Sequence, residues 1–351
     1  MPVRSFKLLV VSLWLLRSAL SQSESAQLYG QPAIGILTFP VTEQVWEGSR
    51  SIDKVVRDLR GTSLPPRSLT AYAASNSWSS SDSLPSYFDA SYVNWLSQAG
   101  ARVVPIPFDL PLADLEDLFP KLNGVLFTGG PAQPETDKEY FNTATALYNL
   151  VSTSETHVPL WGTCLGFETI SSIVGSGENN VLSEFDAEKL SLPLTFTPEA
   201  DVSQVYSAAN MPPPIREIFS SQNVTTHWHM YGVSSSAFAS NLAPAGLVAT
   251  STNFDREGKE FVSSLEHSSL PIFATQWHPE ANQFDSTDKK GDSTPSRSSD
   301  AVLAMQHLAN FFVGEARKND NKFDDEDDFS IHVLNATSPN TTFDGWIYFF
   351  R

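Results

Sequence analysis

Short, continuously apolar segments alternate with helical patterns along much of the chain. A strand covered on both faces reads as an unbroken apolar run, so these segments are typical of buried strands. They lie at residues 33–38, 102–106, 124–127, 158–161 and 271–276. Apolar side chains recur at helical spacing in residues 92–100, 112–119, 139–152, 165–174 and 300–317. The alternation predicts an α/β fold with a mostly parallel sheet covered by helices on both faces.

The remaining segments are less regular. Shorter β segments, some of them antiparallel, are predicted at residues 190–196, 205–206, 225–233, 247–250 and 261–265. The last helix has Asp300 as its predicted N-cap. An irregular stretch, residues 41–86, follows the first strand and is very rich in serine between residues 75 and 86. Loops of this length inside a domain are usually functional or mobile, and the role of this one stays open.

One residue carries the strongest chemical signal. Cys164 is the only cysteine of the 351 residues, so its thiol cannot form an internal disulfide. Gly162 and Gly166 flank it in the G-x-C-x-G form of a nucleophile elbow, where a strand runs directly into a helix and leaves no room for a Cβ. The helix N-terminus favours the reactive thiolate. The alternative, an inert buried cysteine, fits the two glycines poorly.

A cysteine nucleophile needs a base, and His278 is the best-placed histidine. It follows a buried strand directly and therefore belongs to the same edge of the sheet as Cys164. His157 precedes a strand and belongs to the opposite edge. Pro279 favours extended geometry at His278, so Glu280, two residues on, can reach the imidazole and orient it. The other candidates, His267, His307 and His332, are predicted to be structural or exposed.

Acyl transfer also needs donors for the developing oxyanion. The backbone N–H of Leu165, directly after the nucleophile, is one predicted donor. The N–H of Gly130, in a glycine pair that ends the strand at 124–127, is the other. The alternative for this glycine pair is an ordinary tight turn.

Charge and termini limit the classes of function. A net charge of −18 without a basic cluster argues against a nucleic-acid partner. Residues 1–21 have the layout of a secretory signal peptide, and no later segment has the length of a membrane helix. The sequence predicts a catalytic domain at 30–318 and an acidic, flexible tail at 319–351. Glycosylation sequons at Asn223, Asn335 and Asn340 fit a secretory route.

The segments GTCLGFE at 162–168 and QWHPE at 276–280 together resemble the γ-glutamyl hydrolase family. This family belongs to the class I glutamine amidotransferase-like group, whose fold is flavodoxin-like. Further matching stretches lie at 32–37, 90–93, 99–105, 124–130 and 311–318. The resemblance implies a cysteine-type omega peptidase that cleaves γ-glutamyl bonds, notably in poly-γ-glutamyl folates. It also implies a secreted, lysosomal or vacuolar location, and no metal or cofactor.

The resemblance assigns Cys164 as nucleophile, His278 as base and Glu280 as its partner. It also implies that His229 and Tyr87 belong to the substrate site.

Three assignments stay open. Glu168, one turn into the elbow helix, either contacts substrate or only pairs within the protein. A metal pair formed by His227 and His229 is an alternative, but no nearby cysteine or carboxylate completes it. The number of subunits is not determined, a homodimer being one alternative.

Two rival functions remain. A glutaminase that supplies ammonia to a synthase is opposed by the predicted signal peptide and by the lack of a synthase domain in this sequence. A non-catalytic secreted binding protein is compatible with the fold. The complete set of cysteine, histidine and glutamate argues against it.

Overall fold

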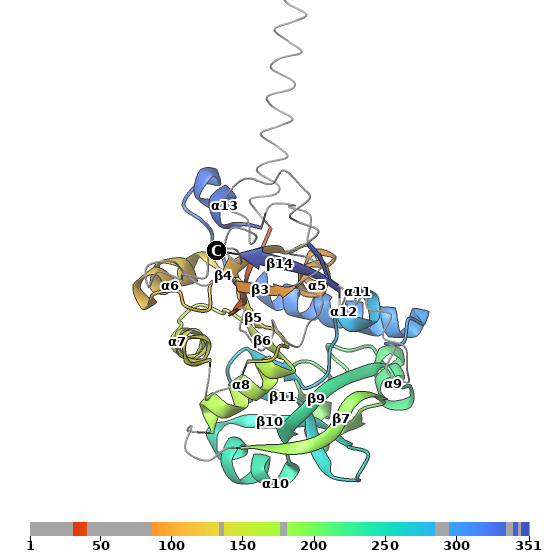
Figure 1. Cartoon of the computed structure of the whole chain (residues 1–351). Coiled ribbons are helices and arrows are strands. Elements are labelled where there is room, and N and C mark those ends of the chain that lie inside the picture. The colour runs from red at the N-terminus through yellow and green to blue at the C-terminus, as the bar shows by residue number, and fades with distance from the viewer. Residues whose placement is uncertain are drawn as a thin grey trace, which may run out of the picture.

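A computed structural model describes residues 31–40, 86–132, 137–175, 181–284, 295–334, 340–342 and 345–350. The predicted signal segment and nearly all of the serine-rich segment lie outside the described residues. A central eight-stranded sheet organises the described part, in the order β4-β1-β5-β6-β12-β11-β10-β8. Figure 1 labels several of its strands and the helices that surround them.

Most of this sheet is parallel, as predicted. The parallel strands are β4 (Arg102–Ile106), β1 (Ala33–Leu37), β5 (Gly124–Phe127), β6 (Leu160–Thr163) and β12 (Ile272–Thr275). The antiparallel strands are β11 (Glu260–His267), β10 (Leu247–Phe254) and β8 (Thr195–Phe196). The predicted α/β class is therefore confirmed.

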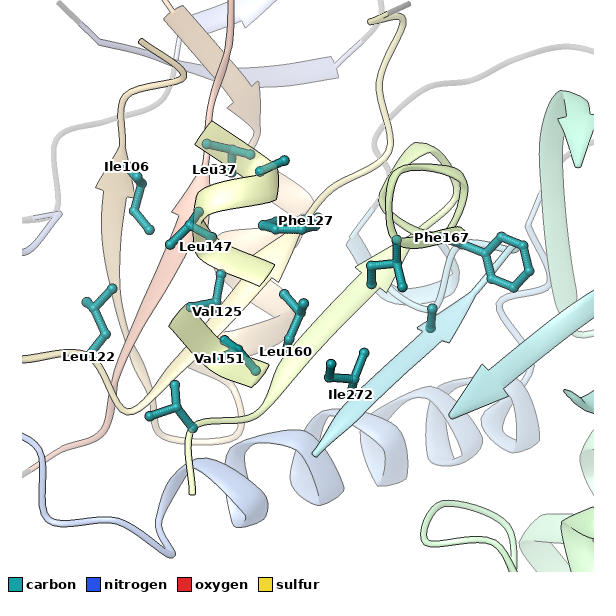
Figure 2. Packing of buried hydrophobic residues seen from close by; sticks show 14 of the residues in the cluster. Leu37, Ile106, Leu122, Val125, Phe127, Leu147, Val151, Leu160, Phe167 and Ile272 are labelled. Carbon is teal, nitrogen blue, oxygen red and sulfur yellow. The ribbon is translucent and has the colours of Figure 1, made fainter. Parts of the chain in front are cut away.

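Successive residues of the parallel strands enter two separate cores on opposite faces of the sheet. In β5, Val125 and Phe127 lie in one core and Leu126 in the other. The first core, part of which Figure 2 shows, is covered by α6 (Leu112–Leu118), α7 (Lys138–Thr153) and α8 (Leu165–Val174). The second is covered by α5 (Ala90–Ser97), α9 (Pro213–Ser221) and α12 (Ser299–Ala316). Burial on both faces explains the unbroken apolar runs of these strands.

Two local predictions were wrong. Ser298, not Asp300, caps α12, since its hydroxyl accepts a hydrogen bond from the Ala301 N–H at 3.1 Å. The apolar pair Val205–Tyr206 lies in a turn rather than in a strand. Val205 and Tyr206 belong to the second core, and the carboxylate of Glu266 accepts hydrogen bonds from the backbone N–H groups of Gln204 and Val205 in this turn.

Two smaller sheets accompany the central one. A β-ribbon pairs β7 (Leu182–Leu192) with β9 (Thr225–Val233). A four-stranded sheet has the order β13-β14-β3-β2, in which β2 is Phe39–Pro40 and β3 is Ser86–Asp89. The remaining short helices are η1 (Phe119–Lys121), η2 (Pro198–Val202), α10 (Ser235–Ala237), η3 (Phe238–Leu242), η4 (Ala243–Ala245) and α11 (Ala281–Phe284).

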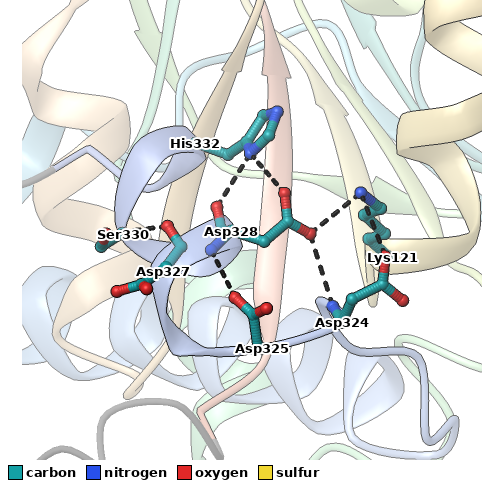
Figure 3. Close-up of polar contacts among 7 residues, drawn as sticks. All are labelled: Lys121, Asp324, Asp325, Asp327, Asp328, Ser330 and His332. Atoms are coloured by element: carbon teal, nitrogen blue, oxygen red, sulfur yellow. Dashed lines mark hydrogen bonds and ion pairs between the residues drawn. The ribbon is translucent and has the colours of Figure 1, made fainter.

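The C-terminal segment is attached to the domain, which differs from the flexible tail predicted for residues 319–351. It contains α13 (Glu326–His332), β13 (Asn340–Thr342) and β14 (Gly345–Phe350). Asp325 caps α13, and Asp328 forms an ion pair of 2.9 Å with Lys121 (Figure 3). The acidic run thus lies at the positive end of a helix, where carboxylates are stabilised.

No helix in the described ranges combines the length and apolar character that spanning a bilayer requires.

Candidate active site at the carboxyl edge of the sheet

Cys164 lies at the predicted elbow between β6 and α8. Its φ of 52° and ψ of −106° are unusual for a residue with a side chain, and they direct the chain from strand into helix. A Cβ on Gly162 would lie 2.7 Å from the carbonyl carbon of Gly166. A Cβ on Gly166 would overlap the carbonyl oxygen of Phe127. The tight contact between strand and helix therefore requires both glycines.

His278 and Glu280 lie at the same edge, as the sequence predicts. The Nδ1 atom of His278 is 2.7 Å from the Oε1 atom of Glu280, and both side chains are buried. Burial alone would lower the pKa of His278, but the charges of Glu280 and Cys164 and hydrogen bonds to both raise it well above its usual value. In a catalytic triad the third member is a carboxylate that orients the histidine in this way. The catalytic roles of His278 and Glu280 stay predictions.

The thiol of Cys164 faces this imidazole. Burial raises the pKa of the thiol, and the charge and hydrogen bond of His278 act in the opposite direction. The direction of this shift is the opposite of the one that we expected from the helix N-terminus. A raised pKa of His278 makes the imidazole a stronger acceptor for the thiol proton.

Tyr92 of α5 is a site residue that the sequence analysis assigned only to the apolar face of a helix. Its hydroxyl accepts a hydrogen bond of 2.8 Å from the Gly129 N–H and lies 3.3 Å from Nδ1 of His278. A Cβ on Gly129 would lie 2.6 Å from Cε1 of His278 and 3.3 Å from Cβ of Cys164. The only sequence signal was a hydroxyl within an otherwise apolar helix face.

Trp228 of β9 forms a further side of the site and was also missed. Its carbonyl oxygen is 3.9 Å from the sulfur of Cys164. Its ring centroid is 4.9 Å from that of His278. The β7–β9 ribbon therefore approaches the reacting sulfur from outside the central sheet, which no local pattern predicts.

His229, on the same strand, is buried within the protein. Its Nδ1 is 2.7 Å from the Tyr231 carbonyl and its Nε2 is 3.1 Å from Nδ1 of His227. Because a carbonyl only accepts, His229 donates from Nδ1 and accepts from His227 at Nε2. Burial lowers the pKa of His229 to about 3 and that of His227 well below its usual value, so both rings are neutral. The substrate role of His229 stays a prediction.

No cluster of three or more metal-ligating side chains occurs in the described ranges. His227 and His229 are instead hydrogen-bonded to each other, and His229 is also hydrogen-bonded to the backbone carbonyl of Tyr231.

Tyr87 lies on β3, and the ring of Phe39 lies beside both Tyr87 and the turn at Gly129 and Gly130. Its ring centroid is 6.1 Å from that of Phe39. The Phe39 ring in turn occupies the space beside Gly130, where a Cβ would lie 2.6 Å from it. Burial raises the pKa of Tyr87. Its assignment to the substrate pocket stays a prediction.

Glu168 lies one turn into α8 and pairs inside the protein. Its Oε1 atom accepts a hydrogen bond of 2.9 Å from Nε2 of Gln276, the residue that follows β12. Burial raises the pKa of Glu168 to about 8, so the carboxyl is protonated at neutral pH. Its charge would also raise the pKa of the Cys164 thiol.

Leu165 is the first residue of α8, so its N–H has no acceptor within the helix. In the glycine turn, the N–H of Gly129 bonds to Tyr92. The oxyanion roles of Leu165 and Gly130 stay predictions.

Comparisons with known proteins show the family to which this chain belongs. A family model described as glutamine amidotransferase class-I matches residues 84–289. Gamma-glutamyl hydrolase B of Dictyostelium discoideum is 36% identical over 261 residues, covering 73% of this chain and 74% of that protein. Gamma-glutamyl hydrolase of Mus musculus is 40% identical over 244 residues, covering 68% and 74%. A glutamine amidotransferase structure from Thermotoga maritima is 10% identical with a TM-score of 0.39, covering 65% and 92%.

The chain therefore belongs to the class-I glutamine amidotransferase family and, within it, to the γ-glutamyl hydrolases. The resemblance drawn from the two sequence motifs is confirmed.

Proposed function

We propose that this enzyme hydrolyses γ-glutamyl peptide bonds through a γ-glutamyl thioester on Cys164. The observation that carries the proposal is the convergence of three side chains at one edge of the sheet. Cys164 and His278 lie side by side, since a Cβ on Gly129 would be 2.6 Å from Cε1 of His278 and 3.3 Å from Cβ of Cys164. His278 is in turn bonded to Glu280 at 2.7 Å. Family membership supports the choice of bond.

The reaction has two steps. His278 takes the thiol proton, the sulfur attacks the γ-carbonyl carbon, and the protonated imidazole then gives its proton to the departing amine. Water next attacks the thioester while His278 accepts one of its protons, which returns to the sulfur as the carboxylic acid is released. Glu280 stabilises the imidazolium in both steps. The N–H of Leu165 is the donor we assign to the oxyanion.

Poly-γ-glutamyl folates are the substrate class we propose. Support comes from the curated relatives, which are named for the γ-glutamyl bond. We further propose that the protein enters the secretory pathway and acts outside the cell, in a lysosome or in a vacuole. The apolar run near the N-terminus and the exposed Asn223 sequon support this route.

Incubation of the purified protein with a poly-γ-glutamyl pteroyl substrate tests the activity, with Cys164→Ala as the control. We expect glutamate or short γ-glutamyl peptides from the wild type only. In rapidly quenched samples we expect Cys164 to gain the mass of the acyl portion of the substrate, which is the pteroyl group with the glutamates that precede the cleaved bond. Release of ammonia from glutamine without peptide cleavage would instead indicate a glutaminase. No turnover of either substrate would indicate a binding protein.

Location and assembly have separate tests. Mass spectrometry of the protein secreted from a eukaryotic host detects signal cleavage and a glycan on Asn223. Sedimentation velocity distinguishes a monomer from the homodimer that the sequence left open.

A further inference from the structure

Strand β3 leads directly into α5, the helix that carries Tyr92. Asp89, the last residue of β3, caps this helix by accepting a hydrogen bond of 2.7 Å from the Ser91 N–H. Tyr92 follows in the first turn, with its hydroxyl 2.8 Å from the Gly129 nitrogen and 3.3 Å from Nδ1 of His278. The position of this end of β3 therefore determines how the Tyr92 hydroxyl meets the imidazole.

The C-terminal strand β14 holds that end of β3. On one side, β2 pairs with only Ser86 and Tyr87. On the other side, β14 pairs with all of β3, including Phe88 and Asp89. The ring of Tyr348 on β14 also lies 6.2 Å from the ring of the buried Phe88. Within the described residues, strand pairing next to α5 therefore comes from β14.

The other half of α5 is held independently. The indole N–H of Trp95 donates a hydrogen bond of 3.2 Å to the Met305 carbonyl of α12. The side-chain amides of Gln98 and Gln283 bond to each other at 2.9 Å. Loss of β14 should therefore loosen the first turn, where Tyr92 lies, and leave the rest of the helix in place.

We propose that β14 is a positioning element of the active site, which holds Tyr92 against His278 through β3 and the start of α5. The strand contributes no reacting group. It completes the frame that fixes the distance between the Tyr92 hydroxyl and the imidazole, so β14, and not the C-terminal segment as a whole, supports the active site.

The experiment uses the full-length chain with Ile347→Pro, because a proline opposite Asp89 disrupts strand pairing. Lys121→Ala is the matched control. It removes the ion pair to Asp328 and so loosens the C-terminal segment at α13 without touching β14. Tyr92→Phe, alone and combined with Ile347→Pro, completes a double-mutant cycle.

Two readouts are measured for each variant. The first is kcat and KM on a γ-glutamyl substrate, which rests on the proposed function. The second is the rate of alkylation by iodoacetamide against pH, which reports Cys164 alone because the chain has no other cysteine. If the wild type cleaves no γ-glutamyl substrate, the proposed function fails, and alkylation still tests β14.

We expect Ile347→Pro to lower kcat about tenfold with a smaller change in KM, since small displacements of catalytic groups are costly. Its alkylation midpoint should move to that of Tyr92→Phe, and the double variant should match Tyr92→Phe within about twofold. Lys121→Ala should leave kcat and the midpoint unchanged.

Three results would overturn the proposal. These are an unchanged kcat and midpoint in folded Ile347→Pro, losses that multiply in the double variant, or an equal loss in Lys121→Ala. If Ile347→Pro does not fold, Tyr348→Ala takes its place with the same expected results. Tyr348→Phe, which keeps the ring, should then restore the activity.

Discussion

The Oε1 atom of Glu280 lies 2.7 Å from Nδ1 of His278, although neither residue belongs to the nucleophile elbow. Both side chains are buried, so their interaction is little screened by solvent. The carboxylate thereby fixes the ring so that its other nitrogen is left for the sulfur. Two residues that lie two positions apart in the sequence therefore act together in the proton transfers of the proposed reaction.

Replacing Glu280 by Gln should weaken the base. The charge of Glu280 is one of the causes that raise the pKa of His278, so its loss should lower that pKa. We expect kcat/KM to fall roughly a hundredfold or more, and the acid limb of its pH profile to move to lower pH. A pH series of kcat/KM measures both. An acid limb that stays in place would show that Glu280 does not set the pKa of His278.

Replacing His278 by Gln should make the thiol less acidic. His278 lowers the pKa of Cys164 against the effect of burial, so the variant should form its thiolate at higher pH than the wild type. Alkylation by iodoacetamide against pH measures this midpoint at the single cysteine. Glu280→Gln is the control that keeps the imidazole. A midpoint that moves to lower pH would contradict the pairing of sulfur and imidazole.

Replacing Glu168 by Gln should change how stability depends on pH. Burial raises the pKa of Glu168 from 4.5 to about 8, so the folded state holds a proton that the unfolded chain releases near its ordinary pKa. The stability contributed by this proton is complete below the ordinary pKa and is lost as pH rises through about 8. Gln cannot ionise, so this loss should disappear in the variant.

Urea unfolding at about pH 5 and about pH 8 measures the difference. We expect Glu168→Gln to gain stability relative to the wild type on going to the higher pH. An identical pH dependence in both proteins would mean that Glu168 is ionised in the folded state.

Replacing Gly129 by Ala should displace His278. The new Cβ would lie 2.6 Å from Cε1 of His278 and 2.8 Å from the Tyr92 hydroxyl. We expect kcat to fall about tenfold or more, because the imidazole moves relative to the sulfur. Gly314→Ala is the control, since a Cβ there meets nothing within 4 Å and lies in α12. The control should keep full activity, and a full kcat in Gly129→Ala would contradict the tight contact.

Local pattern was sufficient for the parallel strands and for the elbow. The apolar runs of these strands are unbroken. Glycine is required at positions 162 and 166 because a Cβ there would clash where the strand turns directly into the helix. The contact of His278 with Glu280 was predicted from their spacing, but the predicted extended geometry was not the reason. Pro279 and Glu280 lie in a turn, in which the Ala281 N–H donates to the His278 carbonyl at 3.3 Å. Local pattern was insufficient at Val205, where a buried turn is hydrogen-bonded to the distant carboxylate of Glu266.

By itself, the sequence determined the fold class, the position of the single thiol at a strand end and the histidine–glutamate pair that follows another strand. These features follow from burial periodicity and backbone geometry over a few residues. Only the tertiary structure placed Tyr92 and Trp228 beside His278 and attached the C-terminal strand to β3. Such contacts join segments far apart in the chain, and they depend on how helices and strands pack rather than on any local pattern.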